Sequence, residues 1–251
     1  LDRCMAVVGG DRYRRLRVLL RTQRPKRVLA LLSKTSILCC AAAWDLPIHV
    51  VVSERNDPRL QRMERLWRWL RCLCYRRADV VTANTDGVLK ALRRLGAWKR
   101  LELLPNPLPA GIGPVDGNVA LSRTREILSV ARLVPQKGLD VLLHAFAHLP
   151  LSVRDGWRLT LVGEGPEWNR LEQLAQTLGL ADVVVFEGFR SDPLMFMQRA
   201  EIFALPSRFE GMPNALLEAM AAGLPSVVTD ASPGPLEMVT DQIHGLVVPS
   251  D

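Results

Sequence analysis

Two carboxylates spaced eight residues apart, Glu210 and Glu218, are the residues of this chain whose spacing points most directly to chemistry. Pro213 suits the first turn of a helix, where a backbone N–H has no partner, so the sequence predicts Glu210 in a loop and Glu218 inside the helix that follows. The helix N-terminus between them offers free N–H groups and the positive end of the helix dipole, which suit a phosphate. Carboxylates on both sides of such a site can hold the hydroxyls of a sugar and of a ribose. Taken alone, the pair also fits a solvated loop glutamate and a helix-surface glutamate.

A basic pair, Arg132 and Lys137, follows a short apolar strand predicted at Ile127–Ala131. Lys137 comes directly before a predicted helix that carries Asp140 in its first turn. An arginine fork and a mobile lysine charge at the end of a strand can neutralise a diphosphate. Two solvated loop cations would give the same pattern.

The turn Gly163-Glu164-Gly165-Pro166 joins a predicted strand to a predicted helix and is typical of a close backbone approach to a nucleotide. It is not the dinucleotide-binding fingerprint, because Trp168 stands where a third glycine is required. A P-loop is also absent, since Lys137 is followed by glycine rather than by Ser or Thr. No D-x-D pair occurs, so the usual carboxylate device for a metal-bound nucleotide sugar is missing.

Short apolar strands alternate with helices in the second half of the chain, which indicates a parallel sheet covered on both faces. In such sheets the ligand lies at the carboxyl ends of the strands. The predicted strands are Ile127–Ala131, Trp157–Val162, Val183–Phe186, Ile202–Leu205, Ser226–Thr229 and Gly245–Val248. The predicted helices are Leu139–His148, Pro166–Leu178, Pro193–Arg199 and Pro213–Ala222.

The first half shows a similar α/β alternation with fewer strands than a complete doubly wound domain. The predicted strands are Arg27–Leu32, Ile48–Ser53, Val80–Thr82 and Arg100–Leu104, and the predicted helices are Tyr13–Arg21, Thr35–Ala43, Arg59–Arg76 and Asp86–Leu95. The segment Pro105 to Ser122 is rich in Pro and Gly and nearly free of charge, and it indicates a link between two domains.

Composition divides the 251 residues in the same way. Residues 1–118 hold 23 Lys/Arg and 10 Asp/Glu, whereas residues 119–251 hold 10 and 16, so the first half faces an anionic partner. The apolar runs are too short to span a bilayer. The five cysteines match neither a zinc site nor a disulfide framework and are expected to be buried or incidental thiols in a reducing cytoplasm.

Five ordered blocks in residues 125–251 resemble the donor domain of glycosyltransferase family 4, the group 1 glycosyl transferases. The blocks are SVARLVPQKGLDVLLHAF, LTLVGEGPEWNRLEQLA, VVVFEGFRSDP, ALPSRFEGMPNALLEAMAAGLPSVVTD and SPGPLEMVTDQIHGLVVP. The first half, with LLSKTSILCCAAAWDLPIHVVVSERNDP and VVTANTDGVLKAL…LLPNPL, resembles members that build cell-surface glycans on lipid-linked acceptors.

This resemblance implies an α/β fold of the GT-B architecture, with two Rossmann-like domains that face each other across a cleft. We expect a partial acceptor-side domain over residues 1–113, a linker over 114–122 and a donor domain over 123–251. Relatives begin before the segment that matches Leu1 and continue past Asp251. We therefore expect the chain to be an internal piece of a longer protein and to turn over poorly by itself.

The family's roles fall on matching positions of this sequence. The resemblance assigns Arg132 and Lys137 to the donor diphosphate, Glu210 to the transferred sugar and Glu218 to the ribose. The other residues that it places in donor binding are Gly163, Gly165, Phe189, Arg190, Gly211, Met212, Pro213, Asn214 and Leu217. Candidates for the acceptor side of the cleft are Ser33, Lys34, Glu54 and Asn56, and each also fits a structural role.

The segment Leu66–Arg71 is basic and aromatic, with Trp67 and Trp69. It fits a helix resting on an anionic membrane surface and equally a helix that packs Leu and Trp on its own sheet. His144 and His148 share a helix face, but no third ligand accompanies them, so a metal site is not expected.

The sequence thus predicts a retaining, metal-independent glycosyltransferase at the cytoplasmic face of a membrane. It would use a nucleotide diphosphate sugar, with UDP favoured, and a glycan or lipid-linked acceptor. One alternative is a nucleotide-sugar epimerase or hydrolase on the same fold. The other is a non-catalytic membrane- or nucleic-acid-binding module. Binding of single-stranded nucleic acid needs aromatic side chains along a basic groove, and the chain has only two tyrosines.

Overall fold

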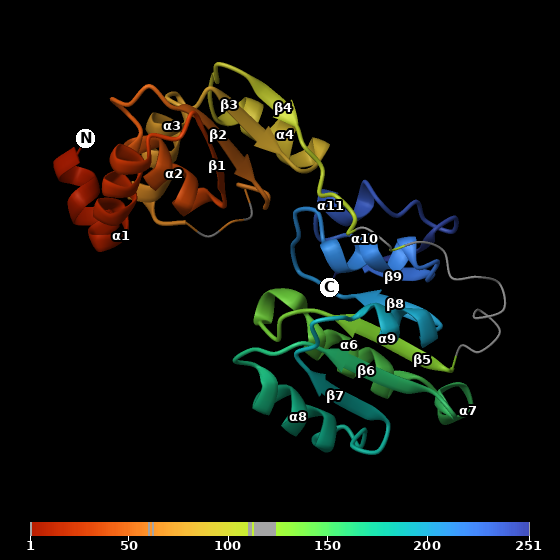
Figure 1. The fold of residues 1–251 in the computed structure, drawn as a ribbon. Helices are drawn as coiled ribbons and strands as arrows, with labels where there is room; N and C mark the ends of the chain where they lie inside the picture. The colour runs from red at the N-terminus through yellow and green to blue at the C-terminus, as the bar shows by residue number, and fades with distance from the viewer. Residues whose placement is uncertain (1, 60, 62, 110–111, 113–123, 251) are drawn as a thin grey trace. The chain divides into compact units, whose positions relative to one another are not determined.

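The computed structural model describes residues 2–59, 61, 63–109, 112 and 124–250, without the side chains of residues 2–4 and 6–9. The chain divides into two compact units, Leu1–Asn106 and Pro107–Asp251 (Figure 1). The linker predicted at 114–122 lies outside the described residues.

The first unit contains a four-stranded parallel sheet in the order β1-β2-β3-β4. Its strands are β1 (Arg27–Leu31), β2 (His49–Glu54), β3 (Val80–Ala83) and β4 (Leu101–Leu103). Its helices are α1 (Asp2–Gln23), α2 (Ser33–Ala42), α3 (Arg65–Tyr75) and α4 (Asp86–Leu95). Val50, Val52 and Val81 of the sheet form one core with Ile37 of α2 and Leu70 of α3.

Two helices of this unit differ from their predicted lengths. The predicted start of α3 at Arg59 is wrong, because the Asp57 carboxylate accepts the Arg59 N–H at 2.8 Å and the Asp57 carbonyl accepts the Gln61 N–H at 3.0 Å. These bonds hold a turn after Asp57, and the helix begins only at Arg65. The segment Asp2–Gln23 is helical on both sides of a kink at Gly10 (φ 52°, ψ −139°), so the helix predicted at Tyr13–Arg21 lies in its second part and a further helical part precedes it.

The second unit contains a six-stranded parallel sheet in the order β10-β9-β8-β5-β6-β7. Its strands are β5 (Glu126–Val130), β6 (Arg158–Val162), β7 (Val184–Gly188), β8 (Ile202–Leu205), β9 (Ser226–Thr229) and β10 (Gly245–Val248). Its main helices are α6 (Leu139–His148), α8 (Trp168–Thr177), α9 (Leu194–Arg199) and α10 (Asn214–Ala221). The sequence prediction missed three short elements, η1 (Pro135–Lys137), α7 (Leu151–Arg154) and α11 (Pro233–Leu236).

The strand order reverses between β5 and β8. The chain moves outward from β5 to β6 and β7, returns to place β8 against the other side of β5, and moves outward again to β9 and β10 (Figure 1). The two central strands pair through Ile127↔Ile202 and Leu128↔Phe203. Loops that leave the carboxyl ends of such adjacent strands diverge and form the crevice where α/β sheets bind ligands.

Both faces of this sheet are covered, which confirms the predicted α/β class with parallel sheets. One core contains Leu143 and Phe146 of α6 with Leu171 of α8. The core on the other side contains Met197 of α9 and Leu216 of α10.

Within the described residues, no helix combines the length and the apolar character needed to cross a membrane. The described cysteine side chains form no disulfide, and those of Cys39, Cys40 and Cys74 are buried, as expected. Burial raises the pKa of Cys39 to about 11, so this thiol is protonated at neutral pH.

Candidate functional site

Lys137 and Glu210 meet at the strand reversal of the second unit. Lys137 ends η1 in the loop after β5, and Glu210 lies in the loop between β8 and α10. The Lys137 Nζ donates a hydrogen bond to Glu210 Oε1 within an ion pair, and the two side chains are only 16% and 7% exposed. The two predicted groups are therefore brought together although 73 residues separate them.

Glu210 is held by hydroxyl groups from two neighbouring segments. Ser207 Oγ donates to Glu210 Oε1 at 2.7 Å, and Ser232 Oγ accepts the Glu210 backbone N–H at 2.8 Å. Thr229, the last residue of β9, donates to the Ser207 carbonyl at 2.6 Å. The carboxylate is consequently fixed in position before any ligand binds.

A second set of contacts ties the Lys137 loop to the Glu210 loop. Gln136 Nε2 donates to the Phe209 carbonyl at 2.8 Å, and the Arg208 N–H donates to the Gln136 carbonyl at 2.8 Å. The Arg208 guanidinium binds both carboxylate oxygens of Asp140, at 3.0 and 2.9 Å. Burial tends to raise the pKa of Asp140, but the hydrogen bonds and charge of Arg208 outweigh it, and the pKa lies below its ordinary value.

Close backbone packing requires glycine next to the basic pair. Gly138 has φ +62°, and a Cβ there would lie 2.0 Å from the Pro206 carbonyl oxygen. A Cβ at Gly163 or Gly165 would lie 1.9 Å from the Ala131 carbonyl oxygen or 2.2 Å from that of Leu133. The glycine turn thus packs on the loop that carries Arg132, while its predicted contact with a nucleotide remains a prediction.

The second glutamate, Glu218, lies within α10 and is half-buried. Burial raises the pKa of its carboxyl group. No described residue forms a hydrogen bond or ion pair with this carboxylate, so its oxygens can accept bonds from ligand hydroxyls. Glu218 is therefore not the fully solvated helix-surface glutamate of the alternative interpretation.

The helix between the two glutamates begins one residue later than predicted. Pro213 is the N-cap residue, with φ −76° and ψ 113°, rather than the first helical residue, and α10 starts at Asn214. The N-cap residue makes no side-chain hydrogen bond to this end. Of the other predicted donor residues, Gly211 is buried, while Met212 and Leu217 are half-buried.

The remaining donor-side residues follow neighbouring strands of the same sheet. Arg132 is exposed just after β5, and in the described part of the chain it forms no ion pair. Phe189, 68% exposed, and Arg190 follow β7. Arg190 is bound to Glu187 at 2.7 Å, and the Phe189 N–H contacts Glu164 Oε1 at 3.4 Å.

The acceptor-side candidates do not share one environment in the first unit. Ser33 and Glu54 are buried, and Ser33 Oγ donates to Glu54 Oε2 at 2.7 Å. Tyr75 donates to Glu54 Oε1 at 2.6 Å, and the buried Arg71 lies 3.9 Å from the same oxygen. Arg71 and Tyr75 carry no motif that marks them in the sequence, and the buried network that they form with Ser33 and Glu54 is consistent with a structural role for residues 33 and 54.

The accessible acceptor-side candidates are Lys34 and Asn56, which are exposed and half-buried, respectively. Lys34 Nζ lies 5.1 Å from the centre of the Trp67 ring, a cation–π distance. Leu32, the N-cap of α2, has φ 72° and ψ 142°, a region that strains any residue except glycine. A role for these residues in acceptor binding remains a prediction.

The histidine pair on α6 has a local explanation. The Nδ1 of His148 lies 2.8 Å from the His144 carbonyl oxygen. Among the residues that the structure describes, no group of three His, Cys, Asp or Glu side chains is arranged to hold a metal ion.

Comparison with known sequences identifies the family. The profile of the family "Glycosyl transferases group 1" matches residues 118–251, and that of the "Glycosyl transferase 4-like domain" matches residues 6–107. The chain belongs to the group 1 glycosyl transferases. The predicted family membership is confirmed.

Two curated relatives share sequence similarity with the chain. The chain is 39% identical over 154 residues to an exopolysaccharide phosphotransferase of Streptomyces coelicolor, with 61% of this chain and 16% of the relative aligned. It is 30% identical over 210 residues to a Campylobacter jejuni 4-α-N-acetylgalactosaminyltransferase named for a diphospho-undecaprenol substrate, with 80% of this chain and 56% of the relative aligned. The chain therefore spans little more than half of the second relative and far less of the first.

A solved structure supports the fold. The Anabaena protein HepE in complex with UDP-glucose matches 92% of this chain and 67% of its own, with a TM-score of 0.80 and 21% sequence identity. This likeness confirms the GT-B class of fold.

Proposed function

We propose that the protein is a retaining glycosyltransferase that moves a sugar from a nucleotide diphosphate sugar, with a UDP sugar favoured, to a glycan or lipid-linked acceptor in cell-surface polysaccharide synthesis. The observation that carries this proposal is the Lys137–Glu210 pair at the strand reversal of a group 1 glycosyl transferase. Two relatives support the substrate classes, since one was solved with UDP-glucose and another is named for a diphospho-undecaprenol compound.

In this proposal the charge that develops on the leaving diphosphate is stabilised by protein cations and backbone dipoles. Lys137 has three N–H donors and gives one to Glu210, which leaves donors for a phosphate oxygen. Arg132 and the N-terminus of α10 add positive potential from two further directions. Because these groups neutralise the diphosphate, we propose that no metal is required, and turnover should survive chelation of divalent ions.

The two glutamates have separate tasks in this proposal. Glu210, fixed by Ser207 and Lys137, accepts hydroxyl hydrogen bonds from the transferred sugar. Glu218 accepts those of the ribose with its unpaired oxygens. Transfer with retention needs no side-chain nucleophile when the acceptor attacks from the face that the diphosphate leaves, which is the mechanism that the family resemblance implies.

The test compares cations at opposite ends of one sheet. Arg132 follows the carboxyl end of β5, whereas Arg158 is exposed at the amino end of β6. Arg132→Ala and Lys137→Ala should each lower UDP affinity about tenfold or more, the effect of losing one charge-assisted hydrogen bond, measured by calorimetry. Arg158→Ala should leave the affinity unchanged.

The same variants then enter a transfer assay with UDP sugars and glycan or lipid-linked acceptors, together with Glu210→Gln. The Arg132→Ala variant tests binding without disturbing the fold, because Arg132 is exposed and forms no ion pair with a described residue. Unchanged UDP affinity in the Arg132 and Lys137 variants would overturn the assignment of the site. Product release from the donor without any acceptor would favour the hydrolase or epimerase alternative.

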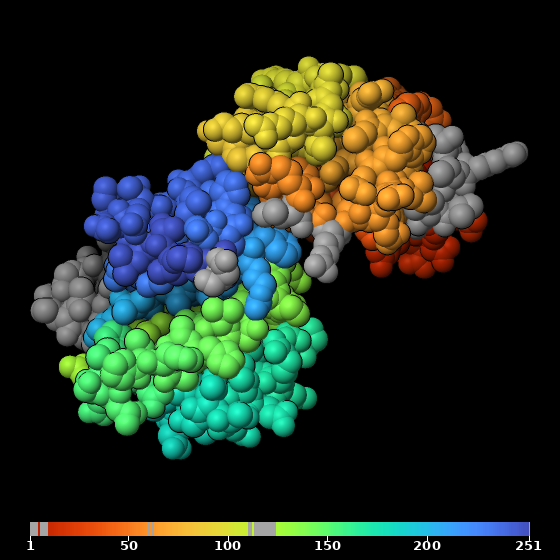
Figure 2. Space-filling view, turned by 180° about the vertical axis from the view of Figure 1, so that it is seen from behind, coloured from red at the N-terminus to blue at the C-terminus, as the bar shows by residue number. Residues whose placement is uncertain are grey.

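Helix α3 supports a proposed contact with an anionic membrane at the cytoplasmic face. Its inner side buries Trp67 and Leu70, as the packing alternative requires. Its outer side exposes Leu66 (44%) and Trp69 (58%) beside the exposed Arg65 and Arg68. In Figure 2 this part of the chain, in orange, lies on the molecular surface. Exposed Trp and Leu among arginines suit a headgroup layer.

A further inference from the structure

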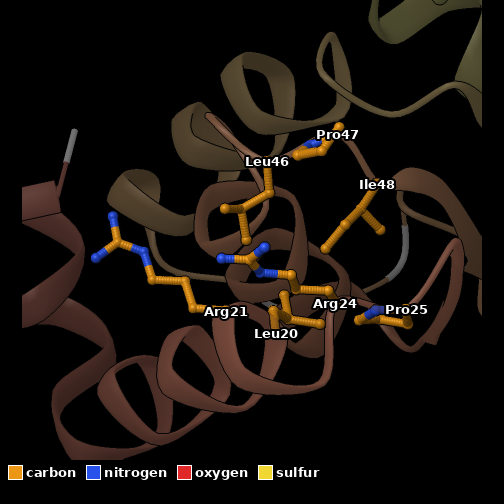
Figure 3. Close-up of a pocket in the computed structure, with 7 residues that line it drawn as sticks. All are labelled: Leu20, Arg21, Arg24, Pro25, Leu46, Pro47 and Ile48. Atoms are coloured by element: carbon orange, nitrogen blue, oxygen red, sulfur yellow. The ribbon is translucent and has the colours of Figure 1, made fainter.

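A cavity of about 400 Å³ lies in the first unit, near the amino ends of strands β1 and β2. It is lined by Leu20, Arg21, Arg24, Pro25, Leu46, Pro47 and Ile48 (Figure 3). These residues belong to the end of α1 and to the segments that precede β1 and β2. The site is thus separate from the acceptor-side candidates, which follow the carboxyl ends of β1 and β2.

The walls of the cavity are largely apolar. Leu20 and Ile48 are buried residues of the core, and Leu46 and Pro25 are half-buried at its mouth. A volume of this size is in the range that holds a small organic ligand. The apolar part of such a ligand would be shielded from water by these side chains.

Arg24 occupies a backbone conformation that does not suit it. Its φ is 44°, and its N–H donates to the Leu20 carbonyl at 3.0 Å, which closes the last turn of α1. Glycine or asparagine is favoured at such a helix end. A residue held in such a conformation is a reason to look for a function.

The charge of Arg24 is unmatched within the described residues, whereas that of Arg21 is not. Arg21 binds Asp45 at 3.3 Å, and Arg17 binds the same carboxylate at 3.0 and 3.1 Å. Figure 3 shows the Arg21 guanidinium on the outer side and the Arg24 guanidinium between Leu20 and Leu46. Asp45, shared by two arginines, is already neutralised, and the exposed Lys26 adds further positive charge.

We propose that this cavity binds a phosphate monoester that carries a short apolar group. The Arg24 fork binds the phosphate oxygens in pairs, while the apolar group lies on Leu20, Pro25, Leu46 and Ile48. A soluble amphiphile and the phosphate of a lipid share this chemistry. The proposal does not depend on the transferase activity.

Octyl phosphate is the probe, and the 251-residue chain is titrated with it in a calorimeter below the micelle threshold of the probe. We expect saturable binding of one molecule, with much weaker binding of inorganic phosphate and of the uncharged octyl glucoside. Equal affinity for octyl glucoside would remove the role of the charge. Equal affinity for inorganic phosphate would remove the role of the apolar walls, and either result would overturn the proposal.

Arg24→Gly separates binding from folding, because glycine accepts a positive φ without strain. It should lower the affinity for octyl phosphate at least tenfold while the melting temperature stays equal or rises. Arg15→Ala, at an exposed position of the same helix, should leave both unchanged, and Arg24→Lys should retain part of the affinity. An Arg24→Gly protein that binds as tightly as the parent would overturn the proposal.

A second arm identifies the source of the ligand by flotation with vesicles that contain phosphatidic acid, in a Trp69→Ser background that removes the membrane contact proposed for α3. If Arg24→Gly loses vesicle binding as well as octyl phosphate, the site takes the phosphate of a lipid. If only octyl phosphate binding is lost, the ligand is a soluble amphiphile.

Discussion

Glu218 and Glu210 stand on the same short motif, but the protein gives them opposite electrostatic surroundings. Glu210 has a cation and a hydroxyl as partners, whereas Glu218 is half-buried without a partner among the described residues. Burial raises the pKa of Glu218, which means that the folded state disfavours its charged form. This difference gives the two residues different mutational signatures.

Glu218→Gln should raise the melting temperature at pH 7 slightly and weaken UDP binding about tenfold. The stability gain follows from the raised pKa, since the charged carboxylate costs free energy that is incurred as the pH rises through the unfolded and then the folded pKa. The loss of affinity follows from removing a charged acceptor. Thermal melts at pH 4 and pH 7 with UDP calorimetry measure both, and a lower melting temperature at pH 7 would contradict the assignment.

The chemistry of the site could be predicted from sequence at the level of residue type, but its contacts could not. Arg132, Lys137 and Glu210 were found through ordered family blocks. The direct Lys137–Glu210 bond was not predicted, because it depends on the return of β8 to the side of β5. Ser33 and Glu54, candidates for the acceptor side of a cleft or for a structural role, form a buried hydrogen bond with each other. Spacing along the chain does not reveal this bond, because 21 residues separate the two.

At the scale of elements, the turn between η1 and α6 determines where Lys137 lies. Two glycines with nearly the same φ permit a controlled comparison: Gly138 (+62°), with Pro206 against it, and Gly179 (+68°), with nothing within 4 Å of an added Cβ. Gly179→Ala should cost only the conformational penalty, about 1 kcal/mol. Gly138→Ala should cost at least about 2 kcal/mol and also lower UDP affinity, because the backbone beside Lys137 must move. Equal losses of stability in urea melts would show that the Pro206 contact is unimportant.

The Arg208–Asp140 pair should stabilise the same two loops from outside. Arg208→Asp or Asp140→Arg alone should lower stability by about 1 kcal/mol and weaken UDP binding, and the double exchange should recover part of both. Because the pKa of Asp140 is lowered, its contribution is present above the unfolded pKa and disappears as the pH falls through the folded value. Acid melts of Asp140→Asn against the parent protein test that sign, and the absence of any recovery in the double exchange would argue against the pair.

The bounds of helices and strands are predicted best where the apolar periodicity and the turn or capping residues at the ends agree. The bounds of α4, α6, β8, β9 and β10 match those expected from the sequence. The start of α3 was missed because a side-chain bond of Asp57 overrides helix propensity. The short helices α7 and α11 have too few residues to show a period.

At the scale of the whole molecule, charge divides the chain between its two units. Residues 1–118 hold 23 Lys/Arg against 10 Asp/Glu, and α3 presents two exposed apolar residues beside exposed arginines. Trp69→Ser should reduce flotation with vesicles rich in phosphatidylglycerol severalfold, and raised salt should reduce flotation of the parent protein. Leu151→Ser, 74% exposed in the second unit, is the matched control. Equal flotation of the Trp69 and Leu151 variants would count against the membrane contact.

The short pairing between β5 and β8 also has a consequence for motion. The β-ladder between β5 and β8 registers two residue pairs, compared with five between β5 and β6. Lys137–Glu210 crosses this seam on the carboxyl side, and Arg199–Glu126, at 2.9 Å, crosses it at the amino end of β5. A ligand that bridges Lys137 and Glu210 would therefore hold β5 and β8 together more firmly. Amide hydrogen exchange in β5 and β8 should slow on ligand binding more than exchange in β7 or β10.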